Sequence, residues 1–311
     1  MPGPAEPAEW CVGAPGANPY DPPVSSAVGT AARRALRDGL VLAGLGFSAF
    51  LFAVVGPAAG TFGFDAYAYW AVDGADPYRV LVGGLGAFTY SPAIARLFDP
   101  FGLLPWPAFL VLWTALGVAT VAWLGGGRRA LWLLALPPVA LELYHGNVHL
   151  LLAAMIVLGF RYPGVWAFGI LTKVTPGIGL LWFLVRREWR NLAIALGVTA
   201  AVTVVSVAVD APVWRVWIGL LGDASTAAGQ VPQAQVAIPL LLRLPVAAAV
   251  VAWGARTDRR WAVPLAVTIA LPVLWPSGFA ILAACLPLAR ARDVRLPPAP
   301  PVAPATSVSA P

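Results

Sequence analysis

Five polar residues fall within or beside apolar stretches, where a polar side chain needs a specific partner: Asp65, His145, His149, Lys173 and Arg243. Asp65 lies among aromatic residues in TFGFDAYAYW, and partial shielding from water makes a carboxylate a better general base. Lys173 is the only lysine of the chain and sits inside an apolar segment, so it needs an anionic partner. Arg243, in AIPLLLRLPV, carries the planar fork that suits a phosphate. These residue types together indicate proton abstraction beside a bound anion.

Plainer interpretations exist for several of these acids and bases. Asp65 could be a solvated loop residue or the N-cap of a short interfacial helix. Lys173 could form an intramembrane ion pair or extend its amine to the membrane surface. Asp73 and Asp76, in VDGADPYRV, are better explained as turn residues because Asp-Gly and Asp-Pro favour turns.

The segment ELYHGNVH contains both histidines of the chain beside a carboxylate. Glu142, His145 and His149 are spaced i, i+3 and i+7, so one helical face could carry all three as metal ligands. Gly146 and Asn147 are expected to interrupt that helix, which favours polar contacts to a phosphate or a sugar instead. We therefore predict neither a metal nor a cofactor.

The composition that surrounds these residues is that of a membrane protein. Of 311 residues, 59% are hydrophobic and only 11% are charged, whereas a soluble domain carries about 25% charged residues. The net charge of +6 comes from arginines that lie mostly at the ends of apolar segments. This pattern excludes a soluble enzyme, a nucleic-acid-binding module and a disulfide-rich secreted domain. It predicts an all-α, polytopic helical membrane protein.

The apolar segments predict about 8–10 membrane segments, several of them shorter than a full span. They lie between a Pro-rich tail at residues 1–38 and a second tail at residues 291–311, with residues 39–290 as the membrane domain. The basic clusters fall on one side if the segments alternate, which places both termini in the cytoplasm. Residues 162–185 must then enter and leave on the same side, with a break at Pro176 and Gly177; the alternative is one tilted span.

Two long loops, at about residues 59–105 and 210–235, are expected on the opposite face. The first carries Asp65, Tyr69 and Tyr90. The excess of arginine over lysine, with much Ala, Gly and Pro, is typical of a GC-rich bacterial genome, so a bacterial plasma membrane is the predicted location.

Four stretches carry a likeness to a known family: FGFDAYAYWAVDGADPYRV, FTYSPAIARLFDPFGLLP, GNVHLLLAAMIVLGF and ILTKVTPGIGLLWFLVRREWR. They are similar, in order, to a first outer loop with an Asp, a Tyr-x-Pro segment, a Gly-Gln-x-Asn helix start and a Lys-x-x-Pro helix. Together they resemble glycosyltransferase family 87, the polyprenol-phosphate-mannose-dependent α-1,2-mannosyltransferases of the GT-C superfamily.

The resemblance implies a GT-C-like bundle and an inverting transfer on the extracytoplasmic side. It implies a polyprenyl-phosphate sugar donor, with mannose as the expected hexose, and a glycolipid or glycan acceptor. Asp65 would be the general base, and Lys173 and Arg243 would stabilise the leaving phosphate with His145 behind them. The remaining residues expected to contact the substrates are His149, Asn147, Tyr69 and Tyr90.

Two other classes fit parts of the sequence. A lipid or small-molecule transporter, or a flippase, would also use broken helices with a buried lysine, although no internal repeat is visible. A catalytically inactive assembly subunit is the second alternative. The chain has no nucleotide-binding Gly-rich motif in the required strand and helix context, so a nucleotide-driven machine is not predicted.

Overall fold

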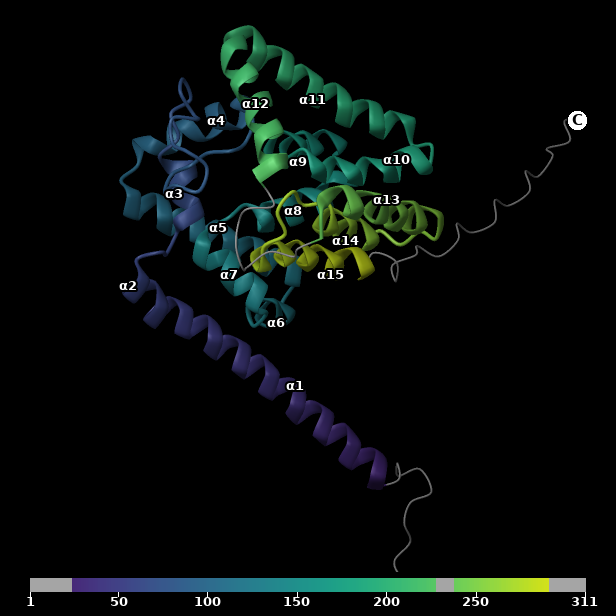
Figure 1. Cartoon of the computed structure of the whole chain (residues 1–311). Helices are drawn as coiled ribbons and strands as arrows, with labels where there is room; N and C mark the ends of the chain where they lie inside the picture. Colours follow the sequence, from purple (N-terminus) through teal and green to yellow (C-terminus); the bar gives the residue numbers. More distant parts are fainter. Residues whose placement is uncertain (1–23, 228–237, 291–311) are drawn as a thin grey trace, which may run out of the picture.

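The structure is a computed structural model, and it describes residues 24–227 and 238–290. Within these two ranges every regular element is a helix, so the predicted all-α class is confirmed (Figure 1). The elements up to residue 103 are α1 (Val24–Phe50), η1 (Leu51–Val55), α2 (Gly56–Ala59), α3 (Phe64–Trp70), α4 (Pro92–Phe98) and η2 (Asp99–Leu103). The next are α5 (Trp106–Gly125), α6 (Arg129–Leu134), α7 (Pro137–His145), α8 (His149–Gly159), η3 (Pro163–Val165), α9 (Trp166–Lys173), η4 (Thr175–Leu180) and α10 (Leu181–Val185). The last are α11 (Trp189–Val209), α12 (Ala211–Ala227), α13 (Leu240–Arg256), α14 (Ala262–Ile269), η5 (Pro276–Ala284) and α15 (Cys285–Arg290).

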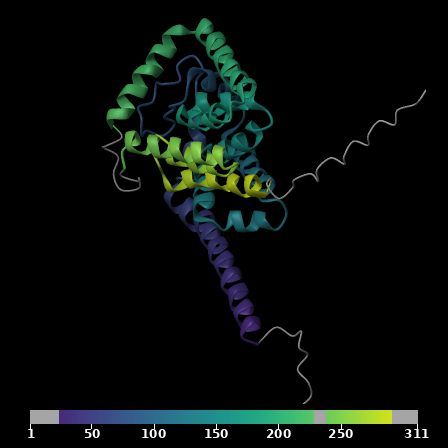
Figure 2. The same ribbon diagram turned by 90° about the vertical axis from the view of Figure 1, so that its right-hand side faces the viewer.

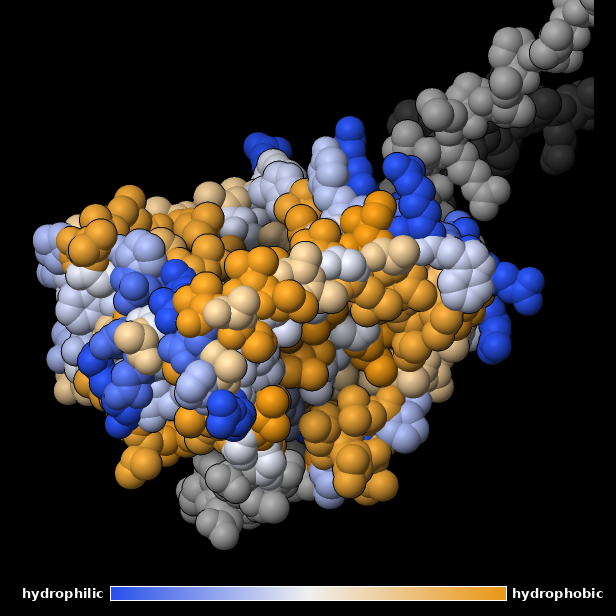
Figure 3. All heavy atoms as spheres, turned by 90° about the horizontal axis from the view of Figure 1, so that it is seen from above, coloured by the Kyte–Doolittle hydropathy of each residue, from blue (hydrophilic) through white to orange (hydrophobic). Residues whose placement is uncertain are grey.

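Three of the described helices are long and apolar enough to cross a membrane: Gly29–Ala59, α5 and α11. The bent pair α7 and α8 makes a fourth if it is one broken span. The other apolar segments form shorter helices, because prolines and glycines divide them into α and 3-10 pieces. Hydrophilic residues gather at the two ends of the molecule and hydrophobic ones lie between them (Figure 3).

Helix α1 begins at Val24, earlier than the sequence predicted, and its first half projects away from the body of the protein (Figures 1 and 2). Its second half docks where α6 meets α7. There Gly44 lies so close to the backbone of Ala135 that a side chain would not fit, and the Ser48 hydroxyl donates to the Leu134 carbonyl at 3.1 Å. Of the predicted N-terminal tail at residues 1–38, residues 24–38 belong to α1, whereas residues 1–23 and the predicted C-terminal tail at residues 291–311 lie outside the described residues.

The first predicted outer loop folds into a packed unit around α3 and α4. Tyr69 contacts the rings of Tyr90, Phe98 and Trp113, with centroid distances of 5.3–5.6 Å. The Gly63 N–H donates to the Tyr144 carbonyl at 2.9 Å and so fixes the start of α3 against α7. This packing holds α3 in place although the surrounding chain is irregular.

The second predicted outer loop is largely helical, and in that respect the prediction was wrong. Helix α12 occupies residues 211–227, and residues 228–237 lie outside the described part of the chain. Asp210 accepts a hydrogen bond from the Val213 N–H at 3.4 Å and pairs with Arg96 of α4 at the same distance. The indole of Trp217 donates to the Thr89 carbonyl at 3.1 Å, so α12 is tied to the first outer loop.

Two broken helices cross the middle of the bundle. Helices α7 and α8 meet at an angle of 111° across Gly146, Asn147 and Val148, which confirms the predicted interruption. Helix α9 ends at Lys173, and Val174 takes the left-handed φ of 53°. The predicted break at Pro176 is thus observed slightly earlier, because a proline ring would clash with the carbonyl four residues before it. The re-entrant path of residues 162–185 stays a prediction.

Candidate active site

Six of the eight predicted site residues converge where α3, the α7–α8 bend and the end of α9 meet: Asp65, Tyr69, Tyr90, Asn147, His149 and Lys173. They form a hydrogen-bonded pair of Asp65 and Asn147, a second group that contains His149 and Lys173, and a pair of Tyr69 and Tyr90. Glu142, which the sequence reasoning considered only as a metal ligand, completes the second group. The sequence signal that could have identified Glu142 is a single carboxylate within an apolar stretch.

The Asp65 carboxylate is held by the amide of Asn147. The Asn147 side chain donates to Asp65 Oδ2 at 2.8 Å, while its own Oδ1 accepts the Val148 N–H at 2.8 Å. The second bond fixes the amide so that its NH₂ group points at the carboxylate. Asp65 is only partly buried, and its Oδ1 is left for another donor. One fixed donor therefore orients this carboxylate, and one of its oxygens stays available as an acceptor.

Gly146 allows α3 and the bend to approach each other this closely. Its φ is 69°, and a Cβ at this position would lie 2.7 Å from the Cβ of Ala66. The Gly146 carbonyl accepts the indole N–H of Trp113 at 2.7 Å. A glycine is therefore required here both by backbone conformation and by space.

The Lys173 ammonium ends a chain of hydrogen bonds that starts at Glu142. Glu142 is 1% exposed, and its carboxylate accepts the backbone N–H groups of His149 and Leu150 and, at 2.8 Å, the His149 Nδ1–H. With Nδ1 as the donor, His149 Nε2 is an acceptor, and the Lys173 ammonium donates to it at 3.2 Å.

The two predicted tyrosines form the wall beside the ammonium. The Lys173 Nζ lies 5.7 Å from the ring centre of Tyr90, and the Tyr90 and Tyr69 hydroxyls are 2.8 Å apart. Burial raises the pKa of both phenols, most of all through loss of solvation, so both stay neutral hydrogen-bonding groups. The Ser91 N–H donates to the Leu171 carbonyl at 3.1 Å, which holds this wall against α9.

The other two predicted residues lie outside this centre. His145 is the last residue of α7, before the bend, and its ring packs edge to face on Tyr144. Arg243 is 7% exposed, and its guanidinium donates to the carbonyls of Ile238, Ile269, Leu271 and Pro272 at 2.7–3.1 Å. Arg243 thus fixes the chain after α14. That chain leads to Gly278, where a Cβ would lie 3.8 Å from His149 Nε2.

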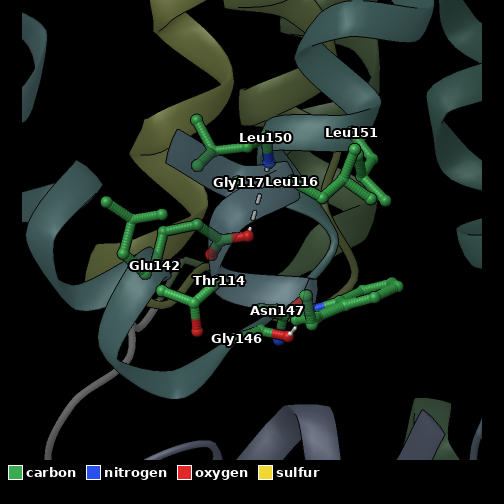
Figure 4. Close-up of a pocket in the computed structure, with 10 residues that line it drawn as sticks. Thr114, Leu116, Gly117, Glu142, Gly146, Asn147, Leu150 and Leu151 are labelled. Carbon is green, nitrogen blue, oxygen red and sulfur yellow. Dashed lines mark hydrogen bonds between the residues drawn. The ribbon is translucent and has the colours of Figure 1, made fainter. Parts of the chain in front are cut away.

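A small hollow adjoins the bend on the side of α5. It measures about 20 Å³, room for about one water molecule, and its lining includes Glu142, Asn147, Thr114 and Gly117 (Figure 4). The Thr114 hydroxyl is buried and has no hydrogen-bond partner among residues 24–227 and 238–290. As for metals, the described residues contain no group of three or more His, Cys, Asp or Glu side chains placed to hold an ion.

These observations define a polytopic helical membrane protein with a polar centre of one oriented carboxylate and one hydrogen-bonded lysine. A family model described as glycosyltransferase family 87 matches residues 88–303, well over half of the chain. The chain therefore belongs to glycosyltransferase family 87, as its sequence stretches predicted, and is a membrane glycosyltransferase. Comparisons with curated proteins and with solved structures gave no match.

The matched range divides the site residues. Tyr90, Asn147, His149 and Lys173 lie within it, whereas α3 with Asp65 precedes it. Asp65 is joined to the matched range by its hydrogen bond with Asn147.

Proposed function

We propose that the protein transfers a hexose, with mannose as the expected sugar, from a polyprenyl-phosphate donor to a glycolipid or glycan acceptor. The reaction takes place on the extracytoplasmic side of a bacterial plasma membrane, and both termini are cytoplasmic. Membership of the family supplies the reaction class. The observation that carries the donor assignment is the Glu142–His149–Lys173 chain, which ends in the Lys173 ammonium.

In this scheme Asp65 is the general base. Its oxygen that is not bound by Asn147 takes the proton from an acceptor hydroxyl, and that hydroxyl oxygen attacks the anomeric carbon of the sugar. The bond from the anomeric carbon to the phosphate oxygen breaks, and its electron pair stays on the phosphate. A single displacement inverts the anomeric configuration. The leaving phosphate is a weak base, so no proton donor is needed.

Lys173 stabilises the charge that develops on the phosphate. One of its three N–H bonds is directed to His149 Nε2, and two remain for phosphate oxygens. Lys173 is the last residue of α9, because Pro176 prevents the helix from continuing. Its ammonium therefore extends from the end of a helix. Tyr69 and Tyr90, whose hydroxyls lie 2.8 Å apart, are the expected contacts to the sugar. The scheme uses no metal and no cofactor.

Arg243 and His145 have secondary places in this proposal. The Arg243 guanidinium has one N–H left after its four carbonyl contacts, so we assign it the positioning of residues 269–272. His145 lies at the end of α7, just before the bend, where its ring is partly exposed and able to contact a substrate.

The test is transfer of labelled mannose from polyprenyl-phosphate mannose to membrane lipid extract by the purified protein in nanodiscs. Asp65→Asn is expected to slow transfer by about 100-fold or more, the usual contribution of a general base. Asp76→Asn, the same change at an exposed residue of the same loop, is expected to transfer at the wild-type rate. Full activity of Asp65→Asn would remove Asp65 from the mechanism. Movement of the intact lipid across the bilayer without bond cleavage would favour a flippase instead.

A further inference from the structure

A second recess opens on the other face of α3. It is an open groove of about 600 Å³, and its lining includes Tyr67, Trp70, Asp73, Arg79, Asp99 and Leu103. Tyr67 follows Asp65 by two residues, a rotation of about 200° around a helix of 3.6 residues per turn. Asp65 and Tyr69 therefore share one face of α3, and Tyr67 and Trp70 share another. We call this recess the α3 groove.

One side of the α3 groove is aromatic and rigid. Tyr67, Trp70 and Trp106 contact one another, with ring centroids 5.2–5.5 Å apart. The Trp70 indole N–H donates to the Leu104 carbonyl at 2.8 Å, which fixes the ring. Fixed aromatic rings provide flat apolar surfaces of the kind that the C–H faces of pyranose rings pack against.

The other side of the groove is charged, and each charged group is oriented by the backbone. Asp99 Oδ1 accepts the Gly74 N–H at 3.0 Å, and Asp73 Oδ1 accepts the Ala75 N–H at 2.9 Å. Arg79 donates to the Ala71 carbonyl at 3.1 Å and lies 3.5 Å from Asp73 Oδ2. Each of the three keeps further hydrogen-bonding capacity. The carboxylates can accept hydrogen bonds from the hydroxyl groups of a sugar, and the guanidinium can donate to neighbouring hydroxyl groups of the same sugar.

The same lining disfavours other ligands. Two carboxylates against one arginine leave a net negative charge, which repels a phosphate group. A polyprenyl or acyl chain would leave Asp73, Asp99 and Arg79 desolvated without partners, which is costly. A neutral, hydroxyl-rich ligand satisfies both the aromatic and the charged side.

We infer that the α3 groove binds the glycan portion of the acceptor, which rests on the proposed transferase function. A helix with its side chains is about 10 Å across, so an acceptor in the groove must reach around α3 to present a hydroxyl to Asp65. A single sugar is too short to do both. The acceptor class is accordingly an oligosaccharide or a glycolipid that already carries more than one neutral sugar, and the aromatic platform sets its orientation.

The test is calorimetric binding of soluble neutral trisaccharides, composed of mannose, glucose or galactose, to the full-length protein in nanodiscs. At least one trisaccharide is expected to bind, and its monosaccharide at least tenfold more weakly. Asp99→Asn keeps an oxygen for the Gly74 N–H but loses the carboxylate, and Arg79→Gln changes an exposed side chain, so both are expected to fold. Each is expected to weaken trisaccharide binding by roughly tenfold, the loss expected for a charged hydrogen bond.

Asp76→Asn is the matched control, because Asp76 is in the same loop but does not line the groove. Binding by Asp99→Asn and Arg79→Gln at wild-type strength, or no trisaccharide binding to the wild type, would overturn the inference. Failure of sugar transfer is a separate result. A protein that binds trisaccharide through the groove yet transfers no mannose would refute the proposed function and leave the groove assignment standing.

Discussion

Replacing Glu142 by glutamine tests whether a buried carboxylate sets the state of the donor site. The oxygen of the glutamine amide can still accept the backbone N–H groups of His149 and Leu150. Its NH₂ group then faces His149 Nδ1, where the carboxylate accepted a hydrogen bond of 2.8 Å. A buried hydrogen bond to a charged group contributes about 1.5–3 kcal/mol, so we expect the free energy of unfolding to fall by about 2 kcal/mol.

The same substitution should also change the donor kinetics. When an NH₂ group faces Nδ1, the favoured His149 tautomer carries its proton on Nε2, which then faces the Lys173 ammonium as a second donor. Displacement of that ammonium is expected to raise the donor KM about tenfold, equivalent to about 1.4 kcal/mol. If Glu142 had only a structural role, the substitution would lower the free energy of unfolding without changing the His149 tautomer or the donor KM.

Three measurements decide the matter: detergent unfolding, donor KM, and ¹⁵N NMR of the histidine ring nitrogens. Glu188→Gln is the control, since Glu188 is a partly exposed carboxylate held by Arg186 and Asn191, where a change of about 0–1 kcal/mol is expected. A wild-type donor KM together with a His149 ring protonated at Nδ1 in Glu142→Gln would refute this role of Glu142.

Further variants test other parts of the site. Lys173→Ala should raise the donor KM at least tenfold, and Lys173→Arg should recover part of the affinity; donor titration checks both, and equal affinities would contradict the phosphate assignment. Gly146→Ala should destabilise the fold by about 1–3 kcal/mol because of its positive φ and the contact with Ala66, whereas Gly197→Ala in open space on α11 should be neutral or slightly stabilising in the same unfolding assay. Arg243→Lys retains the charge but cannot reach four carbonyls, so thermal unfolding should show a loss of about 2–3 kcal/mol; an unchanged midpoint would refute its positioning role. EDTA should leave the transfer rate unchanged, and a loss of activity restored by a divalent cation would contradict the metal-free scheme.

Much of the fold could be predicted from local chemistry. The interruption at Gly146 and Asn147 and the end of α9 before Pro176 follow from the backbone preferences of glycine and proline, which need no knowledge of distant contacts. Helix α12 was missed because residues 210–235 were assigned to the connection between two predicted membrane segments, although residues 213–222 (VWRVWIGLLG) are mostly apolar. Its start depends on Asp210, whose second partner, Arg96, lies far away in the sequence.

The candidate site was predictable as a set of residue types and less so as a set of contacts. Lys173 and Asp65 could be selected from the sequence because a charged side chain in apolar surroundings is energetically costly in a membrane. The roles of Glu142 and Arg243 depend on three-dimensional pairing. The sequence spacing placed Glu142 in a possible metal site, and only the bend directs it to His149. Likewise, nothing local indicates that Arg243 binds backbone carbonyls after α14.

The residues of the polar centre occupy one continuous stretch of the chain, from Asp65 to Lys173. Synthesis proceeds from the N-terminus, so this stretch leaves the ribosome before α11 to α15. The two carboxylates, the histidine and the lysine can therefore neutralise one another early during membrane insertion. No buried charge in this centre has to wait for the C-terminal helices to find a partner. The later helices can then assemble around a centre whose charged groups already have partners.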